Sequence, residues 1–308
     1  MNNNTIIEKT PVVLLELTED SFRNTTFWNC IPPKSGRDEA GEMSSTTLAQ
    51  VLRHLTEDEK KPSRVLLCGG EPLLHPKFLD VIQYLGEKGI PTTLVSDGLL
   101  LSPATVHTAM GLGLSDVRLP LFGFSSDVHD LIIMEDAWNF VLADMKALGN
   151  EGIPYTVDHF ILKDKEGKGR VEGIKLAVAF GAEKILLRAF DANSDPRFES
   201  LVPQEEELIS VLKWAGDLAS EADVSIFWSP ADPDSAHLAP ESLLCACPIS
   251  GIIIPNRYEK ERTLCSLSVN PEGAVTMVHE GGEPVGNLVE ESFGRILSRC
   301  GFGRELCV

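Results

Sequence analysis

The sequence has no long hydrophobic run. No stretch approaches the roughly 20 uninterrupted apolar residues that a membrane-spanning helix needs. The first residues, Met1 to Asn4, provide neither the basic segment nor the apolar segment of a secretory signal. We therefore expect a cytoplasmic protein that has no membrane partner.

Basic residues are scarce relative to acidic ones. The chain has 27 Lys and Arg against 46 Asp and Glu, which gives a formal net charge of −19. Such a surface repels the phosphates of nucleic acids and of anionic lipids, so nucleic acid is excluded as an expected partner. Acidity of this degree most often serves solubility, and it also suits docking to a basic protein or peptide.

Cysteines are few and unevenly placed. The chain has seven, an odd number, and five of them follow residue 240. Both features argue against an extracellular disulfide framework. The clustering indicates a metal or redox site, or the remnant of one.

Short β-branched or leucine-rich runs alternate with segments of helical period from Pro11 to about residue 230. This alternation is typical of repeated βα units on a parallel sheet. The expected fold class is therefore α/β, a partial (βα)6 TIM-like barrel with ligands at the C-terminal ends of its strands. The expected strands are Val12–Leu17, Arg64–Cys68, Thr92–Val95, Asp116–Leu119, Tyr155–Leu162 and Lys184–Arg188. The expected helices are Thr46–Leu55, Pro76–Lys88, Pro103–Leu112, Ala137–Glu151, Val171–Ala179 and Gln204–Ala219.

A boundary is expected where the composition turns to Pro, Ser and Asp, at residues 229–242. We predict a barrel over 1–232 and a small C-terminal domain over 240–308. This domain is too small to be stable without a metal or a partner surface. Its expected elements are β-like runs at Gly251–Ile254, Cys265–Val269 and Ala274–Val278, and one helix from about Glu290 to Ser298.

Separate motifs follow the ends of the expected strands. The second strand leads into Cys68-Gly69-Gly70-Glu71-Pro72, and the third leads into Ser96-Asp97-Gly98. The fourth runs through Val117 to Gly123 and is followed by His129-Asp130. In order and spacing these segments resemble the motifs of the radical SAM family. The resemblance implies a radical SAM type barrel with S-adenosylmethionine as cofactor, contacted by Gly69, Gly70, Glu71, Pro72 and Ser96.

The first strand continues into the segment where radical SAM enzymes carry a cluster-binding loop. In that family a Cys-x3-Cys-x-aromatic-Cys loop holds three irons of a 4Fe-4S cluster, and its cysteine places fall here on Ser21, Thr25 and Trp28. Iron in such clusters requires soft thiolate ligands, which hydroxyl and indole side chains do not provide. We therefore expect no radical SAM cluster at these positions. The chain resembles a degenerate member of the family that does not start radical chemistry itself.

The S-adenosylmethionine site is also altered. Where the family has a ribose-contacting Ser-Leu-Asp, this chain has Pro120-Leu121-Phe122, with no donor at Pro120 and no charge at Phe122. The segment Gly69 to Pro72 therefore has two interpretations. It forms a degenerate S-adenosylmethionine site, or its glycines make a tight turn while Glu71 caps a neighbouring backbone.

The C-terminal cysteines resemble those of a shortened SPASM or twitch domain, the cysteine-rich extension of peptide-modifying radical SAM enzymes. Cys265 to Val278 resembles its pattern of cysteine, strand and glycine turn, and Gly286-Asn287-Leu288 resembles the segment before its helix. A further cysteine of that domain falls on Val278 and is missing. The resemblance implies one auxiliary 4Fe-4S cluster or a zinc ion, and the Cys-x-Cys spacing leaves residual reduced thiols as the alternative. The candidate ligands are Cys245, Cys247, Cys265 and Cys300.

Other polar residues are candidates for ligand contact inside the barrel, namely Asp158, His159 and Arg188. His129 and Asp130 are placed to form a hydrogen-bonded pair, and His75 stands at an expected helix entrance with no chemical role. No catalytic triad order, zinc-protease spacing or phosphate-binding glycine loop is present. This absence favours structural roles for all of these residues.

Three functional hypotheses follow from these residues. The favoured one is a non-catalytic partner of an active radical SAM enzyme, acting with it on a ribosomally made precursor peptide. The resemblance is closest to the SPASM-domain proteins without a radical SAM cluster in GeoRSP-type cassettes. One alternative is an enzyme that uses S-adenosylmethionine or another small ligand without a cluster. The other is an electron-transfer protein with one auxiliary iron-sulfur cluster.

Overall fold

A single eleven-stranded sheet organises the described part of the chain. The computed structural model describes residues 11–19, 41–133, 136–163, 171–190, 197–222, 224–228, 252–253, 266–277 and 283–300. The strand order is β11-β10-β9-β1-β2-β3-β4-β5-β6-β7-β8. The strands are β1 (Val12–Thr18), β2 (Arg64–Gly69), β3 (Thr92–Val95), β4 (Leu114–Phe122), β5 (Tyr155–Ile161), β6 (Lys184–Ala189), β7 (Ser225–Trp228), β8 (Ile252–Ile253), β9 (Ser266–Val269), β10 (Ala274–Met277) and β11 (Gly286–Asn287).

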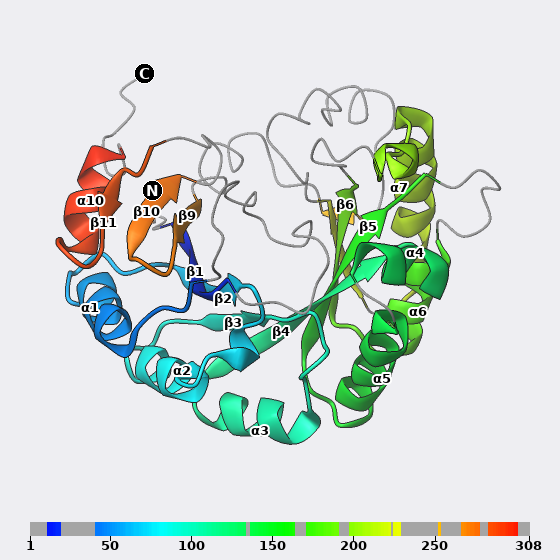
Figure 1. The fold of residues 1–308 in the computed structure, drawn as a ribbon. Helices are drawn as coiled ribbons and strands as arrows, with labels where there is room; N and C mark the ends of the chain where they lie inside the picture. Colours follow the sequence, from blue (N-terminus) through cyan, green and yellow to red (C-terminus); the bar gives the residue numbers. More distant parts are fainter. Residues whose placement is uncertain are drawn as a thin grey trace, which may run out of the picture.

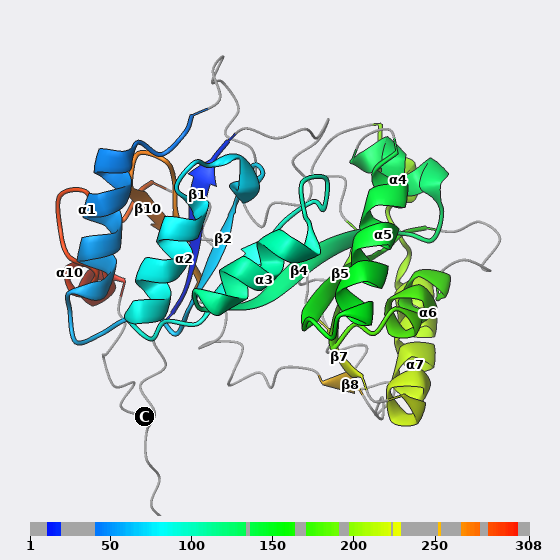
Figure 2. The same cartoon turned by 90° about the horizontal axis from the view of Figure 1, so that it is seen from below.

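Helices cover the outer face of this curved sheet, and they follow one another around it in chain order (Figures 1 and 2). Ser44 and Ser102 cap α1 and α3 by accepting hydrogen bonds from the backbone N–H groups of Thr47 and Thr105. Within the described ranges, no helix combines the length and the apolar character needed to cross a membrane. The helices are α1 (Ser45–Thr56), η1 (Pro72–Leu74), α2 (Phe78–Glu87), α3 (Pro103–Gly111), α4 (Ser126–Ile132), α5 (Ala137–Asn150), α6 (Glu172–Ala179), η2 (Glu199–Leu201), α7 (Glu205–Glu221) and α10 (Phe293–Arg299).

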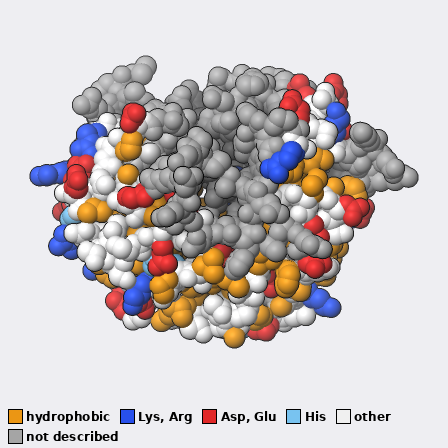
Figure 3. All heavy atoms as spheres, viewed as in Figure 1, with side chains coloured by type: hydrophobic (Ala, Val, Ile, Leu, Met, Phe, Trp, Pro, Cys, Tyr) orange, Lys and Arg blue, Asp and Glu red, His pale blue; other side chains and the backbone are white. Residues whose placement is uncertain are grey.

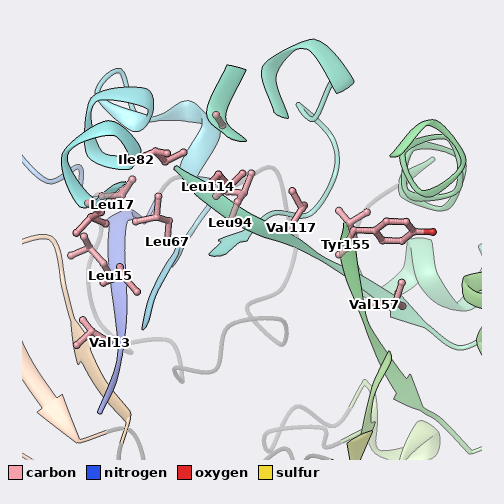
Figure 4. Packing of buried hydrophobic residues seen from close by; sticks show 14 of the residues in the cluster. Val13, Leu15, Leu17, Leu67, Ile82, Leu94, Leu114, Val117, Tyr155 and Val157 are labelled. Carbon is pink, nitrogen blue, oxygen red and sulfur yellow. The ribbon is translucent and has the colours of Figure 1, made fainter. Parts of the chain in front are cut away.

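The core lies between the sheet and the helices. Successive strand residues point to opposite faces, so alternate positions of each strand reach this layer. Val13, Leu15 and Leu17 of β1 are completely buried there, and Val117 of β4 and Val157 of β5 belong to the same cluster (Figure 4). The residues between them, such as Arg118 and Asp158, therefore point to the inner, concave face of the sheet.

The predicted α/β fold is confirmed. Each of the six expected strands is present, and consecutive strands from β1 to β8 pair in parallel. The sequence did not predict β7, a four-residue strand, or α4, a seven-residue helix.

The C-terminal strands extend the barrel sheet beyond β1. Strand β9 pairs in parallel with β1, and β10 and β11 follow in antiparallel order. Helix α10 lies beside α1 (Figure 1), where His54 Nδ1 is 2.7 Å from the Leu288 carbonyl oxygen and the Gly294 N–H donates to Asp58 at 2.6 Å. Residues 229–251 fall outside the described residues, so the division into 1–232 and 240–308 stays a prediction.

The packing of α10 predicts that residues 283–300 unfold together with the barrel. Phe293 is completely buried in the main hydrophobic cluster. We expect Phe293→Ala to lower the free energy of unfolding by about 3–5 kcal/mol, because it leaves a cavity in that cluster. Urea denaturation followed by circular dichroism would measure this loss within one cooperative transition. The matched control is Phe140→Ala at a side chain that is 47% exposed, with an expected change within about 1 kcal/mol. A separate early transition would contradict shared folding.

Candidate functional site

The turn after β2 holds the ends of β1 and β2 together. Gly69 has a φ of 110°, which favours glycine, and a Cβ atom there would overlap the carbonyl oxygen of Thr18. The Gly70 N–H donates to that same carbonyl oxygen at 2.6 Å. The two glycines therefore permit a close approach of two strand ends.

Glu71 is the centre of the hydrogen bonds at this turn. Its side chain is completely buried, and it caps the short helix η1 by accepting from the Leu73 N–H at 3.1 Å. The other carboxyl oxygen accepts from Ser96 Oγ at 2.9 Å and from the Asp97 N–H at 3.0 Å. Glu71 thus joins the loop after β2 to the loop after β3.

Burial raises the pKa of Glu71 well above its usual range, and the neighbouring Asp97 adds to the effect. The raised pKa favours the neutral, protonated form. With both oxygens bonded internally, this carboxyl does not fit as an anionic partner for the amino group of S-adenosylmethionine. The structure brings Gly69, Gly70, Glu71, Pro72 and Ser96 into one turn, and their role in binding S-adenosylmethionine stays a prediction.

The loop after β3 is equally constrained. Ser96 and Asp97 are completely buried, and Ser96 Oγ accepts from the Gly98 N–H at 3.1 Å. Gly98 has a φ of 88°, and a Cβ atom there would lie 2.9 Å from Asp144 Oδ2 of α5. Burial raises the pKa of Asp144 to about 7. The loop after β3 is therefore enclosed between the Glu71 hydrogen bonds and helix α5.

Aromatic side chains occupy the carboxyl ends of β4, β5 and β6. Phe122 is completely buried and stacks on Phe160, with ring centroids 4.4 Å apart and an interplanar angle of 13°. Phe190 meets Phe122 edge-on at 6.2 Å, and Phe198 meets Phe190 at 6.5 Å. Phe122 stands where the resemblance places a ribose-contacting carboxylate. An apolar cluster therefore replaces a polar contact.

A charged cluster lies on the inner face of the same three strands. Arg118 of β4 and Arg188 of β6 both form ion pairs with Oδ2 of Asp158 on β5, the second at 3.4 Å. Asp158 is 2% exposed, and its Oδ1 atom has no hydrogen-bond partner within the part of the chain that the structure describes. The inward placement predicted for Asp158 and Arg188 is present. The sequence analysis missed Arg118, whose signal is its alternation with buried Val117 and Leu119.

His159 is on the opposite face, so its predicted inward orientation is wrong. Its ring lies beside Gly173 of α6, where a Cβ atom would overlap it. The cause is strand alternation, which sends neighbours Asp158 and His159 to opposite faces. His75 takes the structural role expected of it, since Nε2 is 2.9 Å from the Met43 carbonyl oxygen and Nδ1 accepts from the Lys77 N–H at 3.1 Å.

His129 and Asp130 do not form the expected pair. His129 Nδ1 accepts from the Phe122 N–H at 3.2 Å, whereas Asp130 accepts from the Trp138 N–H at 2.7 Å. The His129 ring is completely buried, and it meets the Trp138 ring edge-on at 5.7 Å. Burial lowers the pKa of His129 to about 3, so the neutral ring supports the end of β4.

The expected metal ligands fall mostly outside the described residues. This holds for Ser21, Thr25 and Trp28 and for Cys245, Cys247 and Cys265, while Cys300 follows α10 and is partly exposed. Within the described residues, no group of three or more His, Cys, Asp or Glu side chains is arranged to hold a metal. The donor set at residues 21, 25 and 28 does not fit an iron-sulfur cluster, because it contains no thiolate. The auxiliary cluster stays a prediction.

The Glu71 hydrogen bonds predict a structural effect of substitution. Glu71→Ala leaves three buried donors without their acceptor, so we expect the free energy of unfolding to fall by about 3 kcal/mol or more. Glu71→Gln keeps one acceptor oxygen and should cost about 1–2 kcal/mol. Chemical denaturation would measure both. The control Glu87→Gln changes an exposed carboxylate and should stay within about 0.5 kcal/mol. Equal stability of all three variants would contradict the structural role.

The buried neutral His129 predicts a pH dependence. The unfolded chain binds a proton at this residue below its ordinary pKa of 6.5, whereas the folded chain binds it only near 3. Stability is therefore present above about pH 6.5 and falls by up to about 5 kcal/mol as the pH drops toward 3. His129→Asn keeps a hydrogen-bond acceptor but does not titrate. This variant should therefore lack the pH-dependent loss of stability that His129 causes. Denaturation at several pH values measures the difference, with exposed His107→Asn as control.

Asp144 contributes with the opposite sign, because its raised pKa makes stability fall as the pH rises from about 4 to 7. Comparing His129→Asn with the unchanged chain cancels this contribution. A stability difference that does not vary between pH 6.5 and 4 would contradict the prediction.

Sequence comparisons identify relatives of the barrel region. Residues 28–175 match the profile of the Radical SAM superfamily, whose proteins bind S-adenosylmethionine and a 4Fe-4S cluster. The AdoMet-dependent heme synthase of Methanosarcina barkeri is 26% identical over 100 residues, 32% of this chain and 29% of that protein. The PqqA peptide cyclase of Ruegeria pomeroyi is 27% identical over 164 residues, 51% of this chain and 41% of that protein. The chain thus matches less than half the length of both relatives.

Solved structures share the fold at low sequence identity. SuiB of Streptococcus suis, bound to its precursor peptide SuiA, aligns with a TM-score of 0.70 and 11% identity over 94% of this chain and 64% of that chain. The protein anSMEcpe with bound AdoMet aligns with a TM-score of 0.67 and 14% identity over 95% of this chain and 82% of that chain. The profile match covers residues 28–175, and these solved structures share the α/β TIM-like barrel fold of the chain.

Proposed function

We propose that this chain is a non-catalytic radical SAM-like protein that assists an active radical SAM enzyme in modifying a ribosomally made precursor peptide. The observation that carries the proposal is the donor set Ser21, Thr25 and Trp28, which has no thiolate where the family ligates its cluster. Without that cluster, no electron can be delivered to S-adenosylmethionine at this position. The barrel keeps its architecture without its redox centre.

One feature of the described residues supports loss of the cofactor site. Phe122 fills the end of β4 with a stacked aromatic ring. This side chain stabilises the barrel where the family resemblance places a polar contact to the cofactor.

The peptide as substrate class is supported by the relatives. One curated relative is a PqqA peptide cyclase, and one structural neighbour was solved with its precursor peptide. A precursor peptide with a basic segment would also match the net charge of −19. On the face drawn in Figure 3, acidic and basic side chains are interspersed among the described residues.

The proposal predicts that the isolated chain does not cleave S-adenosylmethionine. The test uses Cys245→Ala/Cys247→Ala/Cys265→Ala, so that an auxiliary cluster does not contribute iron. After anaerobic reconstitution with iron and sulfide, we expect no bound iron and no reductive cleavage of S-adenosylmethionine under dithionite, because no thiolate remains at residues 21, 25 and 28. The matched variant adds Ser21→Cys/Thr25→Cys/Trp28→Cys to restore the ligands, and it should gain iron.

The non-catalytic role would be overturned if the Cys245→Ala/Cys247→Ala/Cys265→Ala variant bound iron and cleaved S-adenosylmethionine. The partner role is tested by adding the unchanged chain to a radical SAM peptide-modifying enzyme from the same source, with its precursor peptide. Product formation measured by mass spectrometry should rise when the chain is present. An unchanged yield, with no binding to enzyme or peptide in calorimetry, would overturn that role.

A further inference from the structure

The charged cluster on the inner face of β4, β5 and β6 contains an unmet hydrogen-bond requirement. Arg118 and Arg188 approach the same oxygen of Asp158, Oδ2, from the two neighbouring strands. The second oxygen, Oδ1, is buried and has no hydrogen-bond partner among the described residues. A buried carboxylate oxygen without a donor is destabilising, because its lost bonds to water are not replaced. A ligand that donates a hydrogen bond to Oδ1 would therefore gain the most binding free energy at this position.

The cluster faces the interior of the barrel and is nearly buried. The three residues lie on the inner face of neighbouring strands, opposite the face that packs against the helices. The side chains of Arg118 and Arg188 keep 12% and 11% of their exposed area, whereas Asp158 keeps 2%. Arg188 also lies over the Phe160 ring, 5.9 Å from its centroid. The remaining access is through the arginines.

The chemistry of the cluster distinguishes between ligands. A ligand that fits must donate to Asp158 Oδ1 and present an acceptor near the guanidinium groups. A carboxylate presents acceptors only, so it would pair with the guanidinium groups but leave Oδ1 unpartnered. An amide carries a carbonyl oxygen and an N–H side by side, so it meets both requirements at once.

The geometry points to an amide-binding site at Arg118, Asp158 and Arg188, which takes a backbone peptide group of the precursor peptide. The N–H of that peptide group donates to Asp158 Oδ1, and its carbonyl oxygen accepts from a guanidinium. This inference rests on the proposed function for the identity of the peptide. Such bonds are stronger near the aromatic cluster of Phe122 and Phe160, where the local dielectric constant is low.

Three small probes of similar shape test the site in the unchanged protein. N-methylacetamide carries the peptide group, methyl acetate has the same shape without the N–H, and acetate carries a negative charge. Binding is followed through the side-chain Nε–H signals of Arg118 and Arg188 in arginine-labelled protein, assigned with Arg118→Lys and Arg188→Lys. We expect N-methylacetamide to bind about tenfold more tightly than methyl acetate, because a hydrogen bond to a charged group contributes about 1.5–3 kcal/mol.

Substitution of the carboxylate provides the second comparison. Asp158→Asn should abolish the tenfold preference, since the asparagine amide can turn its own N–H groups toward the probe. The matched control is Asp80→Asn, which makes the same change at a side chain that is 67% exposed, and it should keep the preference. The probe comparison in the unchanged protein stands by itself if Asp158→Asn does not fold.

Three results would overturn the inference: equal binding of N-methylacetamide and methyl acetate, tighter binding of acetate, or no saturable shift with any probe. Failure of the amide site can be distinguished from failure of the proposed function. If the chain raises peptide modification by its partner enzyme while N-methylacetamide does not bind, only the amide site fails. If the amide probe binds and peptide modification is unchanged, the partner role fails and the site remains.

Discussion

The buried carboxyl of Glu71 is the interaction on which the carboxyl-terminal edge of β1, β2 and β3 depends. It accepts from Leu73 in its own loop and from Ser96 and Asp97 in the next loop. Gly69 and Gly70 bring the same turn against Thr18 at the end of β1. Because these groups are buried, each donor left without Glu71 would cost more than the bond itself contributes. Glu71 therefore links the ends of β2 and β3, and the glycine turn beside it holds the end of β1.

This use of Glu71 separates the motif from the cofactor chemistry with which it is associated. A Gly-Gly-Glu-Pro sequence is required here by a positive φ at Gly69, by a close approach to Thr18 and by a buried cap on η1. These requirements hold whether or not a cofactor binds. Recognition of the motif therefore identifies the barrel, while the residues around it decide the chemistry. At Phe122, where the family resemblance places a polar contact, the side chain takes part in aromatic packing.

Much of the fold could be predicted from the sequence, because β-branched runs and helix signals alternate clearly through the barrel. Thr92–Val95 was predicted with its observed bounds, and Tyr155–Leu162 differs by one residue from β5. The turn at Gly69 to Pro72 and its link to Ser96 were both candidates. The Arg118 contact was not, because a single arginine in a strand shows no partner until the register of three strands is known. The predicted orientation of His159 was wrong for the same reason, since the orientation depends on which alternate residues of the strand face the helices.

Stability alone does not explain why charged side chains lie on the inner face of β4 to β6. Arg118, Asp158 and Arg188 form a charged group there, beside the stacked phenylalanines. Removing charges from water costs about as much as their attraction returns, and well-packed apolar residues are often at least as stable. In Asp158 the balance is worse, because Oδ1 remains without a donor. A charged cluster with such a cost is better explained by a ligand that supplies the missing donor than by its contribution to folding.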